Sequence, residues 1–150
     1  MKTVNSKINP QSGFSLVEIL VVLVIMGLLI SVVAPTVLNR ADDARIQKVH
    51  ADFKAIETAL KIYRLDNYVY PSTEQSLEAL VEASTIDPEP RNFKTGGYLT
   101  EVPRDPWGRP YLYLSPGENG DIDLYSLGAD GISGGEGQNG DVGNWKSANE

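Results

Sequence analysis

Residues 14–34 read FSLVEILVVLVIMGLLISVVA, and this stretch decides how the chain is organised. Only Ser15, Glu18 and Ser31 are polar among its 21 residues. As an α-helix that rises about 1.5 Å per residue, it would extend roughly 30 Å, the thickness of the hydrocarbon core of a bilayer. The sequence therefore predicts a membrane-spanning helix at residues 14–34.

A short basic leader, residues 1–13, precedes this helix and carries Lys2 and Lys7. A secretory signal peptide would have a small-residue cleavage site beyond the apolar run. No such site is evident, and the apolar block continues through Pro35 into a helical pattern. We therefore expect the helix to be retained, with a kink or local unwinding at Pro35, because proline removes a helical hydrogen bond.

Glu18 is unusual because a carboxylate inside an apolar segment is costly unless it lies near the interface or is paired. The residues leave both explanations open. No Lys or Arg occurs between Lys7 and Arg40, so a cationic partner would have to be a new amino terminus created just upstream.

Further along, apolar residues recur at spacings of four, three, four and three, as on one face of an amphipathic helix. These residues are Val49, Phe53, Ile56, Leu60 and Tyr63. The pattern predicts one helix from about residue 14 to residue 65, about 80 Å long, whose second half packs on a soluble domain.

The remainder predicts short elements. Ser72 and Gln75 match a capping box, which predicts a helix of about ten residues. Residues 111–114 and 122–125 are typical of two strands, joined by a turn at 116–120 whose Asn-Gly pair favours positive φ. The predicted fold is α+β, with a long N-terminal helix packed on a small antiparallel sheet that is followed by a Gly-rich C-terminal loop.

Residues 128–143 contain seven Gly, together with Asp130 and Asp141. Trp145 follows, which suggests that the loop folds back and that something holds it. Ca²⁺ binds carboxylate and carbonyl oxygens in irregular geometry. Neither the EF-hand spacing nor a Gly-Gly-x-Gly-x-Asp repeat is present, so the residues alone leave a calcium site and an ordinary Asp/Gly turn open.

Composition excludes several classes of protein. The net charge of −7 argues against nucleic acid as a partner, and the absence of Cys excludes disulfides and thiolate sites. Asp121 and Asp123 share one strand face and could in principle act as an acid/base pair. No pocket, nucleophile or phosphate-binding motif accompanies them, so we predict that the chain is not an enzyme.

The segment GFSLVE at residues 13–18 resembles the prepilin peptidase site of type IV pilins and type II secretion pseudopilins. The resemblance implies cleavage after Gly13, N-methylation of Phe14, and a role for Glu18 in assembly. The leader would then be residues 1–13, the transmembrane part residues 14–34, and the periplasmic pseudopilin domain residues 35–150.

Four further segments, at 70–80, 105–108, 113–117 and 125–131, resemble the major pseudopilins of type II secretion systems, the general secretion pathway protein G family. That resemblance implies a calcium site in the terminal loop. Its ligands would be the Asp130 and Asp141 carboxylates and the Leu127 carbonyl. The absence of cysteine favours this family over many type IV pilins, which close the terminal loop with a disulfide.

The implied function is that of a structural subunit of a periplasmic pseudopilus, a helical filament that drives the export of folded proteins across the outer membrane. The alternative is a type IV pilin of an adhesive or motility filament. The implied partners are other copies of the chain, minor pseudopilins, a prepilin peptidase, an inner-membrane assembly platform, an outer-membrane secretin, and membrane lipid before assembly. The implied location is the inner membrane of a Gram-negative bacterium, as a single-pass protein with its C-terminal domain in the periplasm.

Overall fold

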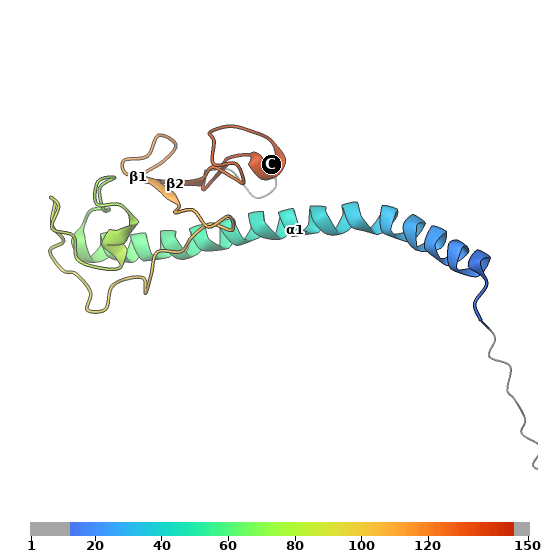
Figure 1. The fold of residues 1–150 in the computed structure, drawn as a ribbon. Helices are drawn as coiled ribbons and strands as arrows, with labels where there is room; N and C mark the ends of the chain where they lie inside the picture. The colour runs from blue at the N-terminus through green and yellow to red at the C-terminus, as the bar shows by residue number, and fades with distance from the viewer. Residues whose placement is uncertain (1–12, 146–150) are drawn as a thin grey trace, which may run out of the picture. The chain divides into compact units, whose positions relative to one another are not determined.

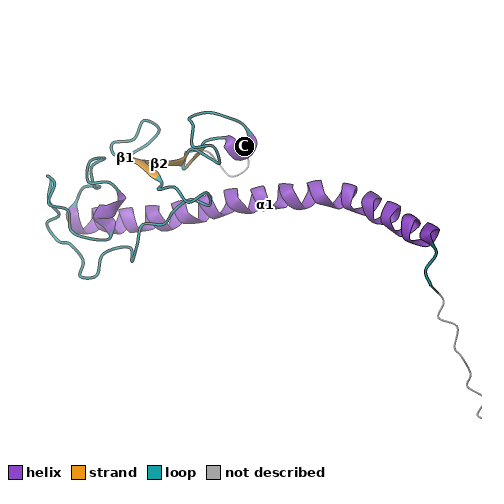
Figure 2. Cartoon of the chain, in the orientation of Figure 1, coloured by secondary structure: helices purple, strands orange, loops and turns teal. Residues whose placement is uncertain are grey.

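The computed structural model describes residues 13–145, apart from the side chains of residues 32–39. The predicted leader therefore lies outside the described residues, except for Gly13. The chain forms two compact units, Met1–Arg40 and Ala41–Glu150. Figure 1 traces the chain, and Figure 2 marks its helices and strands.

One long helix, α1 (Leu16–Asn67), accounts for 52 residues and confirms the predicted helix to within two residues at each end. It begins where the Ser15 carbonyl accepts the amide of Glu18 (3.0 Å), and its helical assignment continues past Pro35. The local unwinding predicted as one possibility at that proline was therefore wrong, and the other possibility, a kink, stays a prediction. The helix ends at Asn67, because the left-handed backbone of Tyr68 (φ 69°) cannot continue it.

The core of the Ala41–Glu150 unit lies along one face of α1. All five apolar residues of the predicted stripe are buried, which confirms the amphipathic pattern. They form one cluster with side chains from the later part of the chain: Leu77, Leu80, Tyr111, Tyr113, Leu124 and Val142. Full burial of such side chains contributes roughly 1.5–3 kcal/mol each, so this cluster is the main source of stability in the unit.

Three short antiparallel strands form a sheet in the order β1 (Leu112–Leu114), β2 (Asp123–Ser126) and β3 (Val142–Gly143). The two predicted strands are confirmed within one residue. β3 was not predicted, because a two-residue strand in a Gly-rich segment carries no alternating pattern. Its pairing of Val142 with Ser126 closes the sheet after the C-terminal loop.

The predicted ten-residue helix after residue 72 was wrong. The capping-box contacts do form, since Gln75 Oε1 accepts the Ser72 amide (2.9 Å) and Ser72 Oγ accepts the Gln75 amide (3.2 Å). However, Ser76 adopts φ 55°, which interrupts an α-helix, and only the 3₁₀ helix η1 (Leu77–Leu80) follows.

The turn between β1 and β2 was also predicted with the wrong backbone. Neither Asn119 nor Gly120 has positive φ. The carboxylate of Asp123, whose residue is only 2% exposed, instead accepts the amides of Glu118 (2.9 Å) and Asn119 (3.1 Å), and the Asn119 side chain. A buried carboxylate satisfied by three donors replaces the turn that the Asn-Gly pair would make.

Candidate functional site

The predicted processing junction precedes the first turn of α1. Gly13 is exposed, and a Cβ placed on it would meet no atom of the described residues within 4 Å. Phe14 is 80% exposed. The described residues therefore impose no steric need for glycine at residue 13.

The apolar run that follows is exposed in the part of the chain that the structure describes. Every large apolar side chain from Phe14 to Ile30 is at least 44% exposed. A continuous apolar surface of this kind marks contact with lipid or with another protein. Ser31 satisfies its hydroxyl within the helix by donating to the Leu28 carbonyl (2.7 Å).

Among the described residues, no helix is long and apolar enough to cross a membrane. The predicted span at residues 14–34 reaches into residues 32–39, whose side chains lie outside the description. The span therefore remains a prediction.

Glu18 lies in the first turn of α1 and is exposed. The partial positive charge at a helix N-terminus favours a carboxylate there. Ion pairs among the described residues join Arg45 to Asp42, Lys48 to Asp52 and Arg64 to Asp121, and none of them involves Glu18. Within the described residues its carboxylate therefore has no cationic partner.

The Gly-rich segment leaves β2 (Figure 1) and returns to the sheet as β3. The antiparallel register pairs Ser126 with Val142, so the next pair of positions is Leu127 and Asp141. The Ala129 amide then donates to the Gln138 carbonyl (2.8 Å). A Cβ on Gly128 would lie 2.8 Å from backbone atoms of residues 138–140, which leaves room only for glycine. The two halves of the loop are thus closely packed.

The three predicted ligands all belong to this folded loop. The Leu127 carbonyl accepts the Gly131 amide (3.2 Å), and Asp130 Oδ1 accepts the Ile132 amide (3.0 Å). Asp141 Oδ2 accepts the Gly134 amide (2.9 Å). Both carboxylates therefore help to fold the loop in addition to carrying its charge.

Within residues 13–145, no group of three or more acidic or His side chains is placed to hold a metal ion. A cation in this loop would thus rely on two carboxylates together with carbonyl or water oxygens. Such a donor set contains hard oxygen ligands alone and suits Ca²⁺, which tolerates irregular geometry. The donor types in the loop are therefore those that calcium binds, and the calcium site itself stays a prediction.

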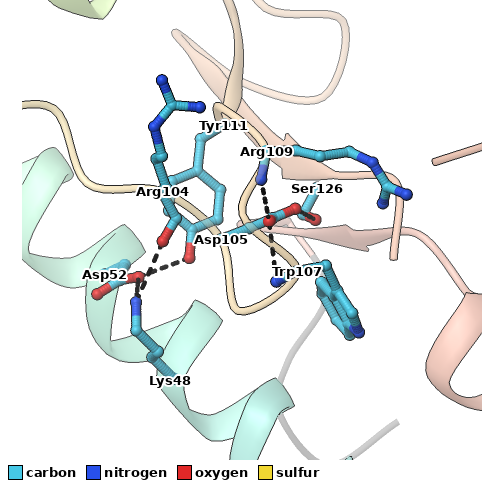
Figure 3. Close-up of polar contacts among 8 residues, drawn as sticks. All are labelled: Lys48, Asp52, Arg104, Asp105, Trp107, Arg109, Tyr111 and Ser126. Atoms are coloured by element: carbon cyan, nitrogen blue, oxygen red, sulfur yellow. Dashed lines mark hydrogen bonds and ion pairs between the residues drawn. The ribbon is translucent and has the colours of Figure 1, made fainter. Parts of the chain in front are cut away.

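A polar network beside the loop was missed in the sequence (Figure 3). Asp105, only 4% exposed, accepts the amides of Trp107 (3.1 Å) and Arg109 (2.7 Å) through Oδ1 and the Ser126 hydroxyl (2.7 Å) through Oδ2. It therefore fixes the turn before β1 to the end of β2. Asp followed by Pro and Gly is typical of such a side-chain-stabilised turn, so the Asp-Pro-Trp-Gly motif at 105–108 was the available signal.

The same network reaches α1 through Tyr111. Its hydroxyl donates to Asp52 Oδ2 (2.6 Å), which also accepts from Lys48 Nζ (2.5 Å). Burial, reinforced by the Asp52 carboxylate, raises the pKa of Tyr111 far above its ordinary value. The phenol therefore remains a hydrogen-bond donor at any physiological pH, and the sheet stays tied to the helix.

Comparison with known proteins now decides the family. The domain described as "Type II secretion system (T2SS), protein G" matches residues 36–145, and the "Prokaryotic N-terminal methylation motif" matches residues 8–34. The chain belongs to the protein G family of the type II secretion system. The two matches are separated by residue 35 alone, and the division of the chain at that residue stays a prediction.

Relatives within the protein G family cover nearly the whole chain. The type II secretion system core protein G of Pseudomonas aeruginosa is 54% identical over 135 residues, which are 90% of this chain and 95% of that protein. The core protein G of Vibrio cholerae is 53% identical over 139 residues, 93% of this chain and 94% of that protein.

A solved relative supports the same fold. The crystal structure of the major pseudopilin from the type 2 secretion system of enterohaemorrhagic Escherichia coli has a TM-score of 0.65 and 48% identity, and covers 72% of this chain and 92% of that chain. These matches confirm the pseudopilin fold and favour the pseudopilin over the alternative type IV pilin.

The acid/base pair considered from the sequence has structural contacts. Asp123 holds the turn before β2, as described above, and Asp121 Oδ2 accepts from Arg64 Nη1 (2.9 Å). The protein G family comprises structural pseudopilin subunits. The family and these contacts agree with a structural role for both carboxylates.

Proposed function

We propose that this chain is the structural subunit of a periplasmic pseudopilus, a helical filament of many copies that drives folded proteins across the outer membrane. The observation that carries the proposal is the uncovered apolar surface from Phe14 to Ile30 on a chain whose other unit has its own core. Lipid would cover this surface before assembly, and neighbouring copies would cover it in the filament. The match to the protein G family supports the same function.

Processing would come first. A prepilin peptidase would cut after Gly13, and the new amino-terminal Phe14 would be N-methylated, as the match to the methylation motif supports. The exposed junction before the helical residues leaves the peptide bond accessible. The mature chain would remain a single-pass protein of the inner membrane, with its C-terminal domain in the periplasm.

Glu18 would then direct assembly. Its carboxylate is exposed in the first turn of α1 and has no ion-pair partner among the described residues. The positive amine of Phe14 in a neighbouring copy would compensate it within the apolar filament core, where an unpaired charge is strongly destabilising. The pair would thereby set the register between copies.

Calcium would hold the C-terminal loop, through the carboxylates of Asp130 and Asp141 and the carbonyl of Leu127. The support is their position in one tightly packed loop and the all-oxygen donor set. When bound, the ion would neutralise two carboxylates that lie in a chain of net charge −7. The folded loop would keep Trp145 packed against Tyr125, whose ring centroid lies 6.0 Å away.

The chain would work with other components. Minor pseudopilins, an inner-membrane assembly platform and an outer-membrane secretin would complete the apparatus, and nucleic acid would have no part in it. Energy would come from those partners, since the sequence has no phosphate-binding Gly-rich loop with its Lys.

The test is to overproduce the chain together with the secretion apparatus, shear filaments from the cells and identify their subunit by intact mass. A filament built from this chain and beginning at Phe14 is the expected result. Filaments without this chain, or secretion that continues at the normal rate in a deletion strain, would contradict the proposal.

A further inference from the structure

Arg109 lies far from the terminal loop in sequence, yet its guanidinium is part of that loop. Nη1 donates to the Gly128 carbonyl (2.6 Å) and Nη2 to the Ala129 carbonyl (2.9 Å). The planar guanidinium can hold two adjacent carbonyls at once, which fixes both peptide units. A lysine ammonium has no such geometry.

The loop also closes over this side chain. A Cβ on Gly131 would lie 2.7 Å from Cζ and 2.8 Å from Nε of Arg109, so the glycine backbone packs directly on the guanidinium. Gly131 has φ +71°, and its amide donates to the Leu127 carbonyl (3.2 Å). The turn at 127–131 is therefore built around the charge of Arg109.

The position of Arg109 is set by the core of the unit. Its amide donates to the buried Asp105 carboxylate (2.7 Å), and its carbonyl accepts the Asp105 amide (2.8 Å). Asp105 also accepts from Ser126 at the end of β2. In Figure 3 the side chain of Arg109 extends away from Asp105, which holds only the backbone. The backbone of Arg109 is thus fixed, and its guanidinium reaches the loop from that fixed position.

We propose that Arg109 is a positioning residue that acts as a built-in cation and holds the turn at 127–131 in its folded conformation without calcium. The consequence for calcium rests on the proposed function. Because the Gly128 and Ala129 carbonyls already face a positive charge, repulsion between like charges opposes a second cation on them. Apart from the Leu127 carbonyl, any carbonyl ligands of calcium would then come from residues 133–141, so calcium would join the turn held by Arg109 to the second half of the loop.

The test compares the full mature chain in detergent micelles with Arg109→Gln, by hydrogen–deuterium exchange in excess chelator. Arg104→Gln is the matched control, because Arg104 is exposed and donates to the Gly108 carbonyl (3.1 Å), outside the loop. In Arg109→Gln, peptides covering residues 127–132 should exchange at least about tenfold faster, since bonds from a charged donor are lost. The control should match the wild type.

Equal exchange of residues 127–132 in Arg109→Gln and the wild type, in chelator, would overturn the proposal. If the core peptides at 49–63 of Arg109→Gln also lose protection, the Arg109→Lys variant decides, because it keeps the charge and loses the paired bonds. In Arg109→Lys, faster exchange confined to the turn at 127–131 supports the proposal, and exchange equal to that of the wild type refutes it. A wild-type chain that does not respond to calcium would count against the calcium site alone, because the chelator comparison needs no metal.

Discussion

Removal of calcium should lower the melting temperature of the Ala41–Glu150 unit. The physical reason is that a cation bound only by the folded loop stabilises the folded state according to its concentration. The Asp130→Asn variant tests the same site by changing a proposed ligand instead of removing calcium. Asparagine keeps an acceptor for the Ile132 amide (3.0 Å) but removes the charge, so the effect of the charge is separated from that of the hydrogen bond.

The size of the effect follows from the size of the unit. At a hundredfold excess over Kd, calcium would stabilise the fold by about 2.7 kcal/mol. The Ala41–Glu150 unit has 110 residues, and its unfolding entropy is about 230 cal/mol/K at roughly 2.1 cal/mol/K per residue. The expected difference in melting temperature between calcium and chelator is therefore about 12 °C.

Tryptophan fluorescence of the mature chain in detergent micelles is a suitable assay, because Trp145 packs on Tyr125 beside the loop. Asp121→Asn is the control, since Asp121 is exposed and pairs with Arg64 outside the loop. It should keep the full difference, and Asp130→Asn should abolish it. An unchanged melting temperature after verified metal removal would refute the reasoning.

Three further predictions concern processing, assembly and pH. Gly13→Leu should block cleavage, so that intact mass retains the leader; normal processing would contradict the assigned junction. Glu18→Ala should leave the protein in the membrane but sharply reduce sheared filaments, and an undiminished yield would exclude the pairing with Phe14. Burial raises the pKa of Tyr113, whose hydroxyl donates to the Pro71 carbonyl (2.9 Å), to about 12. The protonated Tyr113 hydroxyl therefore stabilises the folded state fully below about pH 10, the pKa of an unfolded tyrosine. This contribution to the free energy of unfolding is lost as pH rises through about 12. The urea midpoint of unfolding should fall as pH rises over that range, and it should fall less steeply in Tyr113→Phe than in the wild type. Equal pH dependence in the two proteins would contradict this role of Tyr113.

Elements whose apolar pattern repeats over many residues could be predicted from the sequence. The amphipathic stripe of α1 repeats over many residues, and every member of it is buried. Short elements depend on contacts that no local pattern encodes. The 3₁₀ helix η1 follows a residue forced to positive φ, and β3 exists only because β2 is there to pair with it.

The candidate site divides in the same way. Asp130 and Asp141 were singled out by their place in a Gly-rich segment, whereas the Leu127 carbonyl came from the family resemblance alone. Arg109 could not be found from the sequence, because its contacts with Gly128 and Ala129 join segments about twenty residues apart. The local sequence Gly-Arg-Pro does not indicate that the guanidinium contacts a later loop.

The composition of the terminal loop explains why charged groups must hold it. Fixing one residue of backbone costs about 1–2 kcal/mol, and glycine loses more freedom than any other residue. Between Gly128 and Asp141 the sole large apolar side chain is Ile132, which is 68% exposed and so offsets little of that cost. Close packing nevertheless requires glycine, because a Cβ on Gly128 would meet backbone atoms at 2.8 Å. The loop therefore needs strong polar contacts, and Arg109 supplies them to its first half from within the fold. A calcium ion bound by Asp130 and the Leu127 carbonyl in the first half and by Asp141 in the second would join the two halves, which would make the integrity of each subunit, and hence secretion, depend on calcium outside the inner membrane.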